Sequence, residues 1–186
     1  GIDPFNELKV MQAIKSFQLK FETQNSISQT ILVNNQDVTG AIRSPEVTKL
    51  VSTIASQKAV RELLTAQQKT MGHSGGLVAE GRDIGSSVFP DAELKVFLTA
   101  SASERARRRA LDLKNNGYQA PSLIELEAQI LERDRIDSTR EISPLLKAID
   151  ATELITDGMN IEEVIETLVA LFREKVPKEV WQHPNH

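Results

Sequence analysis

The sequence predicts an α/β protein with a parallel sheet in its second half and a small antiparallel insert near the N-terminus. Three observations predict this class. Short apolar runs in the second half are separated by helical segments, which is the order that gives parallel strands joined by crossover helices. Alternation of apolar and polar residues within 17–38 is typical of antiparallel strands. The 186 residues are 40% hydrophobic, which is enough to bury one core of ordinary domain size.

Composition excludes several classes of protein. No apolar run approaches the roughly 20 residues of a membrane span, and no segment resembles a signal peptide. The chain has no cysteine, so a disulfide framework and thiolate metal sites are excluded and a reducing cytoplasm fits. A net charge of −4 argues against binding of nucleic acid polymers, which usually need a basic face. We therefore expect a cytoplasmic protein without a membrane or nucleic acid partner, and its three scattered histidines predict no metal site.

The first part of the chain predicts helices around a hairpin. Residues 1–5 fit poorly with the rest of the chain, and we interpret them as an expression remnant, with the native chain beginning upstream of Asn6. Ser44 followed by Pro45 is typical of a helix start. The predicted elements are a helix over 6–14, strands within 17–21 and 30–38 with a turn at Asn34 and Asn35, and helices beginning at Ser44 and covering 59–69.

The second part predicts alternating strands and helices. Buried strands are predicted at Leu77–Glu80 and Leu94–Leu98, with a weaker one at Leu154–Thr156. Three helices begin with the spacing of a capping box, in which a polar residue precedes a glutamate by three positions. These pairs are Ser101 with Glu104, Ser122 with Glu125 and Asn160 with Glu163.

Arginines follow the predicted strands. Arg82 and Asp83 come directly after the first strand of the second part, so we expect both at the carboxyl edge of the sheet, where ligands bind in open α/β folds. A guanidinium there suits phosphate, because its planar fork matches two phosphate oxygens. Alternatively, the two residues form a surface turn and pair with their neighbours.

A second charged cluster lies in "ERDRIDSTRE", residues 132–141. Arg133, Asp137 and Arg140 are spaced i, i+4 and i+7, which predicts one helix face. Two guanidiniums around a carboxylate can hold a phosphate while the carboxylate accepts from a sugar hydroxyl. Mixed-charge helix faces are often only solvated, and the run "ERARRRA" is also typical of an exposed helix.

Linked motifs in a fixed order give the chain a resemblance to a known family. They are "DVTGAIRSPEV", "KAVRELL", "EGRDIGSSVFPDAELKVFLTAS", "SERARRRA" and "ERDRIDSTR", within about 17–172. The chain resembles the cytidylate kinases, bacterial-type nucleoside monophosphate kinases that transfer a phosphoryl group from ATP to CMP or dCMP. The resemblance implies a P-loop kinase-like core over 72–176 with a short lid near 133–140, a nucleotide-monophosphate-binding insert with flanking helices over 6–71, and a tail over 177–186.

The resemblance implies a role for each matched residue. The residues that match contacts to cytosine are Ser52, Arg61 and Asp83. Cytosine presents an amino donor beside two acceptors, so polar contacts can distinguish it from a base of similar shape and reversed polarity. On the acceptor side, the matched residues are the phosphate-handling and catalytic Arg82, Arg133 and Arg140, with Asp137 at the ribose. On the donor side, they are Glu80 near Mg²⁺, with Arg105 and Arg109 near ATP.

One departure from the family pattern is the P-loop. No G-x-x-x-x-G-K-[ST] sequence occurs in the chain, although such a loop should cradle the ATP phosphates. We expect that the first core strand and the P-loop are missing from this chain, that the chain is inactive, and that exposed apolar surface drives self-association. Some relatives of this kind are C-terminal domains behind a pantoate ligase. The alternatives are a non-catalytic CMP-binding or interaction domain, and an α/β domain whose arginines are structural.

Overall fold

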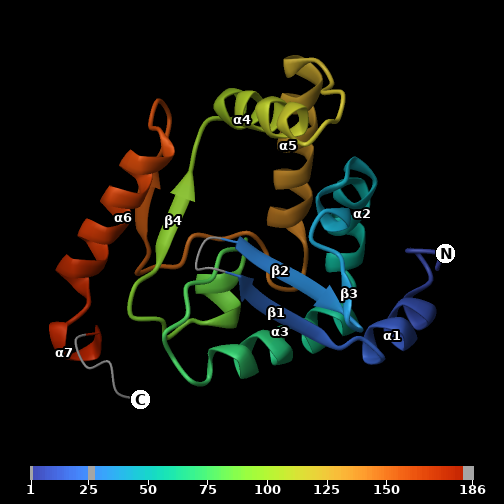
Figure 1. The fold of residues 1–186 in the computed structure, drawn as a ribbon, viewed down its shortest axis with the longest axis horizontal. Coiled ribbons are helices and arrows are strands. Elements are labelled where there is room, and N and C mark those ends of the chain that lie inside the picture. The colour runs from blue at the N-terminus through green and yellow to red at the C-terminus, as the bar shows by residue number, and fades with distance from the viewer. Residues whose placement is uncertain (1, 25–27, 182–186) are drawn as a thin grey trace. The chain divides into compact units, whose positions relative to one another are not determined.

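The computed structural model describes residues 2–24 and 28–181 (Figure 1). Its contacts divide the chain into two units. The first unit comprises residues 1–77 with 140–142, and the second comprises 78–139 with 143–186. The part of the predicted tail beyond Trp181 lies outside the described residues. Among the described residues, no helix combines the length and apolarity needed to cross a membrane.

The first unit contains an antiparallel sheet of β1 (Leu19–Gln24), β2 (Ser28–Val33) and β3 (Gln36–Asp37), in that order. Leu19 pairs with Val33, and Val33 pairs with Gln36 across a two-residue turn. The turn residues Asn34 and Asn35 have φ angles of 51° and 63°. Asparagine tolerates this left-handed conformation, which two-residue hairpins require. The predicted hairpin and its turn are therefore confirmed.

Helices precede and follow this sheet along the chain. They are α1 (Glu7–Lys15), a 3-10 turn η1 (Ala41–Arg43), α2 (Pro45–Ala55) and α3 (Lys58–Gly72). Ser44 Oγ accepts a hydrogen bond from Val47 N at 3.3 Å, and Pro45 occupies the first helical position, as predicted. Val10 of α1 and Val60 of α3 are the buried hydrophobic side chains among the described residues of this unit.

The second unit contains a parallel pair, β4 (Val96–Thr99) and β5 (Thr152–Ile155), with Val96 opposite Thr152. The remaining elements are the π-helical turn η2 (Ile84–Val88), α4 (Ala102–Asn115), α5 (Leu123–Thr139), α6 (Ile161–Lys175) and α7 (Lys178–Trp181). All three predicted capping residues accept a hydrogen bond from the backbone N–H of the glutamate three positions on, at 2.9 to 3.2 Å. The predicted mixed α/β class, with a parallel and a small antiparallel sheet, is confirmed.

Burial in the second unit is uneven. Helices α4 and α5 lie side by side (Figure 1) and enclose a core of Ala106, Leu113 and Leu126. In contrast, α6 has no buried residue. One face of α6 presents exposed apolar side chains at i, i+4, i+8 and i+11, namely Ile161, Ile165, Val169 and Phe172.

Two predictions about the fold are wrong. Leu77–Glu80 forms no strand, and the Val78 side chain is 99% exposed. An apolar run becomes a buried strand only when neighbours supply ladder hydrogen bonds and cover its faces. Among the described residues, β4 pairs only with β5, so the run finds no such neighbour.

The second error concerns Arg140, which does not continue the helix face of Arg133 and Asp137. Helix α5 ends at Thr139. Thr139 Oγ1 bonds back to the carbonyl of Arg135 at 2.7 Å, and Leu145 N donates to the carbonyl of Asp137 at 2.8 Å. The second bond occupies a carbonyl of the last turn, so the chain leaves the helix before Arg140.

Candidate functional site

The segment before η2 places Arg82 and Asp83 at the start of a tight turn. Ser87 N and Val88 N both donate to the carbonyl of Asp83, at 2.9 and 3.2 Å. A Cβ atom on Gly81 would lie 2.7 Å from Ile84 Cγ1, so a larger residue there would push this side chain aside. The turn buries Asp83, which is 6% exposed, and leaves Arg82 partly accessible.

Arg82 joins two carboxylates of α5. Its Nη1 donates to Asp134 Oδ1 at 2.7 Å, and its Nε lies 2.9 Å from Asp137 Oδ2. The Asp137 side chain is 4% exposed, so this is a largely buried ion pair. Helix α5 can present both carboxylates because positions i and i+3 share a helix face.

Arg105 of α4 reaches the same cluster. Its Nη1 donates to the other oxygen of Asp134, Oδ2, at 2.5 Å, and its Nε donates to the carbonyl of Ala100 at 3.0 Å. Burial alone would raise the pKa of Asp134, but hydrogen bonds from Arg82 and Arg105 lower it below its usual value. Asp134 is therefore an ionised carboxylate shared by two guanidiniums.

Arg133 completes the cluster on the side of Asp137. Its Nε lies 3.7 Å from Asp137 Oδ2. Burial lowers the pKa of Arg133, and the nearby charge of Arg82 lowers it further, against the attraction of Asp137. Together, Arg82, Arg105, Arg133, Asp134 and Asp137 carry one net positive charge, which is the sign that attracts an anion.

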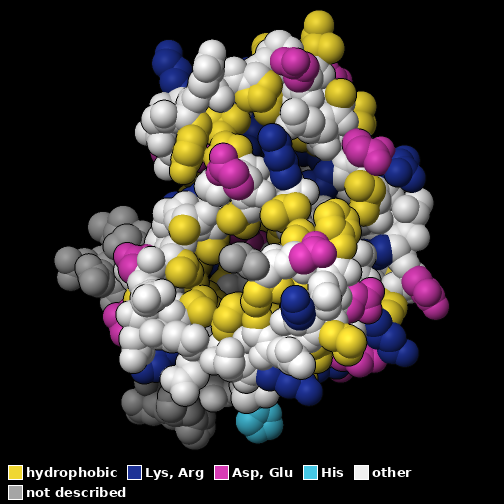
Figure 2. All heavy atoms as spheres, turned by 90° about the vertical axis from the view of Figure 1, so that its right-hand side faces the viewer, with side chains coloured by type: hydrophobic (Ala, Val, Ile, Leu, Met, Phe, Trp, Pro, Cys, Tyr) yellow, Lys and Arg dark blue, Asp and Glu magenta, His cyan; other side chains and the backbone are white. Residues whose placement is uncertain are grey.

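This positive excess is local. On the face of the molecule shown in Figure 2, basic, acidic and hydrophobic side chains are interspersed and do not segregate by charge. The described basic side chains therefore form no extended patch on this face.

The structure brings four of the predicted site residues into one cluster: Arg82 and Arg133 pair with Asp137, and Arg105 is linked to Arg82 through Asp134. Arg109 lies on α4 and pairs with Asp112 at 2.9 Å, while Glu80 is exposed in the segment before η2. The predicted residues that belong to the first unit are Ser52 on α2, Arg61 on α3 and Arg140 after α5. Arg61 is 9% exposed, and Ser52 is half-buried.

Asp134 is the member of the cluster that the sequence reasoning missed. Its position three residues before Asp137 was the available signal, since both carboxylates share a helix face. The spacing could not show that Arg82 and Arg105, 52 and 29 residues away, would reach it.

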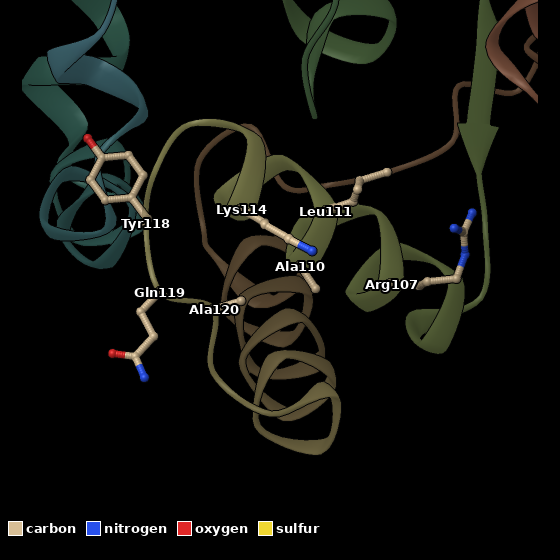
Figure 3. A pocket seen from close by; sticks show the side chains of 7 residues that line it. All are labelled: Arg107, Ala110, Leu111, Lys114, Tyr118, Gln119 and Ala120. Atoms are coloured by element: carbon tan, nitrogen blue, oxygen red, sulfur yellow. The ribbon is translucent and has the colours of Figure 1, made fainter.

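A separate open hollow lies between α4 and the loop that comes after it. Its volume is about 510 Å³, and Figure 3 shows its lining, which comes from Arg107, Ala110, Leu111, Lys114, Tyr118, Gln119 and Ala120. None of the predicted site residues lines it. Within 2–24 and 28–181, no group of three or more His, Cys, Asp or Glu side chains could hold a metal ion.

Comparison with known proteins gives the arginine cluster its context. The family model described as cytidylate kinase matches residues 1–174, including the five residues interpreted above as an expression remnant. The chain belongs to the cytidylate kinase family. Within the first unit, Gln57 Nε2 donates to the carbonyl of Pro4 at 2.7 Å, so this early segment also makes a contact of its own.

Curated relatives of this cytidylate kinase family member carry two enzyme names. This chain is 63% identical over 180 residues to a "Bifunctional pantoate ligase/cytidylate kinase" of Prochlorococcus marinus (strain MIT 9313), and the match covers 97% of this chain and 36% of the relative. A protein of the same name from Synechococcus sp. (strain CC9902) is 55% identical over 184 residues, covering 99% of this chain and 38% of the relative. The chain thus spans little more than a third of these relatives, and the expected relation to such fusions is confirmed.

Proposed function

We propose that this chain is the nucleotide-binding part of a cytidylate kinase that transfers a phosphoryl group from ATP to CMP or dCMP, forming CDP or dCDP. One observation carries the proposal: the cluster of Arg82, Arg105 and Arg133 lies within a chain of the cytidylate kinase family. Phosphoryl transfer needs alignment and positive charge around the migrating group more than covalent help from the protein.

On the acceptor side, the proposed roles follow the family motifs. Ser52, Arg61 and Asp83 contact the cytosine ring. Asp137 holds Arg82 and also accepts from a ribose hydroxyl. The residues that bind the phosphate and stabilise charge during transfer are Arg82, Arg133 and Arg140.

On the donor side, Arg105 and Arg109 bind ATP, and Glu80 serves the Mg²⁺ that accompanies it. Mg²⁺ is commonly bound by one or two carboxylates together with substrate phosphates, and the exposed Glu80 can offer one carboxylate. When bound, the ion neutralises charge on the phosphates. The protein's part is to supply oxygen at Glu80 and guanidinium donors at the two arginines.

We also propose that the 186 residues alone do not catalyse the transfer. They contain no G-x-x-x-x-G-K-[ST] sequence, the loop whose amides and lysine hold the donor phosphates. That observation also favours a second candidate function, a non-catalytic CMP-binding or interaction domain. An in-frame loop of this type in the coding sequence upstream would decide for the kinase.

Self-association is a further part of the proposal. The stripe on α6 is exposed, and so are Leu98 of β4 and Ile155 of β5, at 54% and 61%. Exposed apolar side chains beside short strands with free edges favour pairing with another copy. We propose that copies of the chain cover this surface for one another.

Nucleotide preference tests the function. Calorimetric titration of the chain with CMP, dCMP, AMP and GMP should give the tightest binding with the two cytidine nucleotides, because the side chains proposed to contact the base offer polar groups that match cytosine. Arg61→Ala should reduce this preference, whereas Arg135→Ala, an exposed arginine of α5 outside the cluster, should leave it unchanged. Tighter binding of AMP or GMP by the wild-type chain would reject the assignment.

A further inference from the structure

Asp134 joins arginines of different segments, unlike Glu104 of α4 and Glu132 of α5. Glu104 pairs with Arg107 and Arg108 of its own helix, and Glu132 pairs with Arg135 of its own helix. Asp134 instead joins two arginines from two other segments, Arg82 before η2 and Arg105 on α4. The side chains of all three are between 23% and 33% exposed, so an ion from solvent can reach them.

Each arginine is held at two points, which fixes the plane of its guanidinium. Arg82 is held by Asp134 and Asp137, and Arg105 by Asp134 and the carbonyl of Ala100. In both arginines, Nη1 and Nε are the atoms used in these contacts. The two Nη1 atoms bond to oxygens of a single carboxylate, so the two guanidiniums are tied to each other through it.

We propose that Asp134 is a positioning residue that unites Arg82 and Arg105 into one binding unit for a single phosphoryl group. The inference rests on the proposed function, in which Arg82 belongs to the acceptor side and Arg105 to the donor side. Arg105 would reach the phosphate of CMP from the side of the donor, so the two guanidiniums fixed through one carboxylate would contact the same phosphate. Fixed guanidiniums lose less conformational entropy on binding, so the alignment strengthens the phosphate contact.

The experiment separates phosphate binding from base binding. CMP and cytidine are titrated calorimetrically into the wild-type chain and into Asp134→Asn, and the ratio of their dissociation constants measures the contribution of the phosphate. We expect Asp134→Asn to weaken CMP binding about tenfold and to leave cytidine binding unchanged, because the loss of one aligned donor pair costs about 1.4 kcal/mol. Asp134→Glu, which restores the charge one methylene further out, should recover part of the loss.

Glu132→Gln is the matched control, because it removes a carboxylate paired with an arginine on the same helix. It should leave the ratio unchanged. The dissociation constants of CMP for the double variant Asp134→Asn/Arg105→Ala and for Arg105→Ala alone should differ by less than about twofold, because the two residues act as a unit. Thermal melting shows whether each variant folds. If Asp134→Asn does not fold, the ratio of dissociation constants is measured with Asp134→Glu instead.

The outcomes distinguish this inference from the proposed function. An unchanged ratio in Asp134→Asn, with wild-type preference for CMP intact, would overturn the inference and leave the function standing. If the wild-type chain prefers AMP or GMP, and Asp134→Asn removes the contribution of the phosphate to binding, the proposed function would be overturned and the inference would stand. Equal binding of CMP and cytidine by the wild-type chain would overturn both.

Discussion

Arg82 Nε lies 2.9 Å from Asp137 Oδ2, and the Asp137 side chain is 4% exposed. A carboxylate buried this deeply depends on its cation, because neither charge is solvated well once the other is removed. We expect Asp137→Asn to lower the free energy of unfolding by about 1–3 kcal/mol, the usual cost of removing one partner from a buried polar contact. Urea denaturation measures the change.

The same helix supplies the control for this prediction. Glu132→Gln also removes a negative charge that faces an arginine, but the side chains of Glu132 and Arg135 are 55% and 63% exposed. Surface ion pairs contribute little, so the denaturation midpoint should scarcely move. Equal losses in the two variants would contradict the importance of burial at Asp137.

The local part of the fold could be predicted from the sequence. Ser44, Ser101 and Asn160 all cap helices as predicted, because a capping residue and its backbone donor are only three positions apart. The hairpin turn at Asn34 and Asn35 is equally local. In each case the residue type and its immediate neighbours determine the conformation.

The errors concern contacts between distant residues. The run Leu77–Glu80 has the composition of a strand, but strand formation depends on a partner that its own residues do not specify. The spacing of the "ERDRIDSTRE" cluster identified Arg133 and Asp137 correctly as helix neighbours but could not show where α5 ends. Asp134 was missed because its two partners come from other segments.

The β2–β3 turn offers a test of backbone strain. Asn35 has a φ of 63°, a conformation that glycine adopts freely and that alanine adopts only with strain. We expect Asn35→Gly to raise the free energy of unfolding by about 0.5 kcal/mol and Asn35→Ala to lower it by about 1 kcal/mol. Thermal denaturation of both variants measures the difference. A more stable alanine variant would show that the turn does not hold this conformation in solution.

The ion pairs of Glu104 predict a dependence of stability on pH. A bidentate hydrogen bond from Arg107 lowers the pKa of Glu104 to about 2, against the effect of burial and with further help from Arg108. Because the pKa is lower in the folded state, the stabilisation is fully present above the ordinary pKa of 4.5 and is lost as pH falls toward about 2.

Urea denaturation at several pH values between 6 and 2 tests this prediction. The difference in unfolding free energy between the wild-type chain and Glu104→Gln should stay constant above about pH 5 and shrink below it. The pKa of Glu132 is also lowered, chiefly by a hydrogen bond from Arg135, but this exposed pair contributes little to stability, so the difference for Glu132→Gln should be small at every pH. A difference that grows on acidification would contradict the assignment of Glu104.

Loss of an arginine that is proposed to bind phosphate should impair catalysis in a longer version of the chain that carries a P-loop. We expect Arg82→Ala and Arg140→Ala each to lower kcat/KM for CMP by about 10²- to 10³-fold, the scale for removing one donor that stabilises developing charge. Lysine at either position should restore only part of the activity, because a point charge does not reproduce the guanidinium fork. Steady-state kinetics decide the matter. Near-wild-type values in both alanine variants would remove these residues from the proposed site.

The isolated chain should show little CMP-dependent release of ADP from ATP. A P-loop supplies the amides and lysine that hold the β- and γ-phosphates, together with a hydroxyl that helps to hold Mg²⁺, and no such sequence occurs in these 186 residues. Arg82 and Arg133 cannot replace it, because they are proposed to hold the acceptor and the migrating group without fixing the donor in line. A coupled assay with CMP, ATP and Mg²⁺ measures turnover.

Light scattering on the same sample measures the mass and tests self-association. We expect a species larger than the 20.6 kDa chain, because Ile165 and Val169 of α6 are 54% and 40% exposed. Replacing both by glutamate should shift the mass to that of a single chain, whereas Ile124→Glu, which changes an 81% exposed side chain on α5, should not. A monomeric wild-type chain would overturn the proposed pairing. Rapid turnover in the coupled assay would overturn the proposed need for a P-loop. The two results are independent, because pairing is proposed to depend on α6 and turnover on the P-loop.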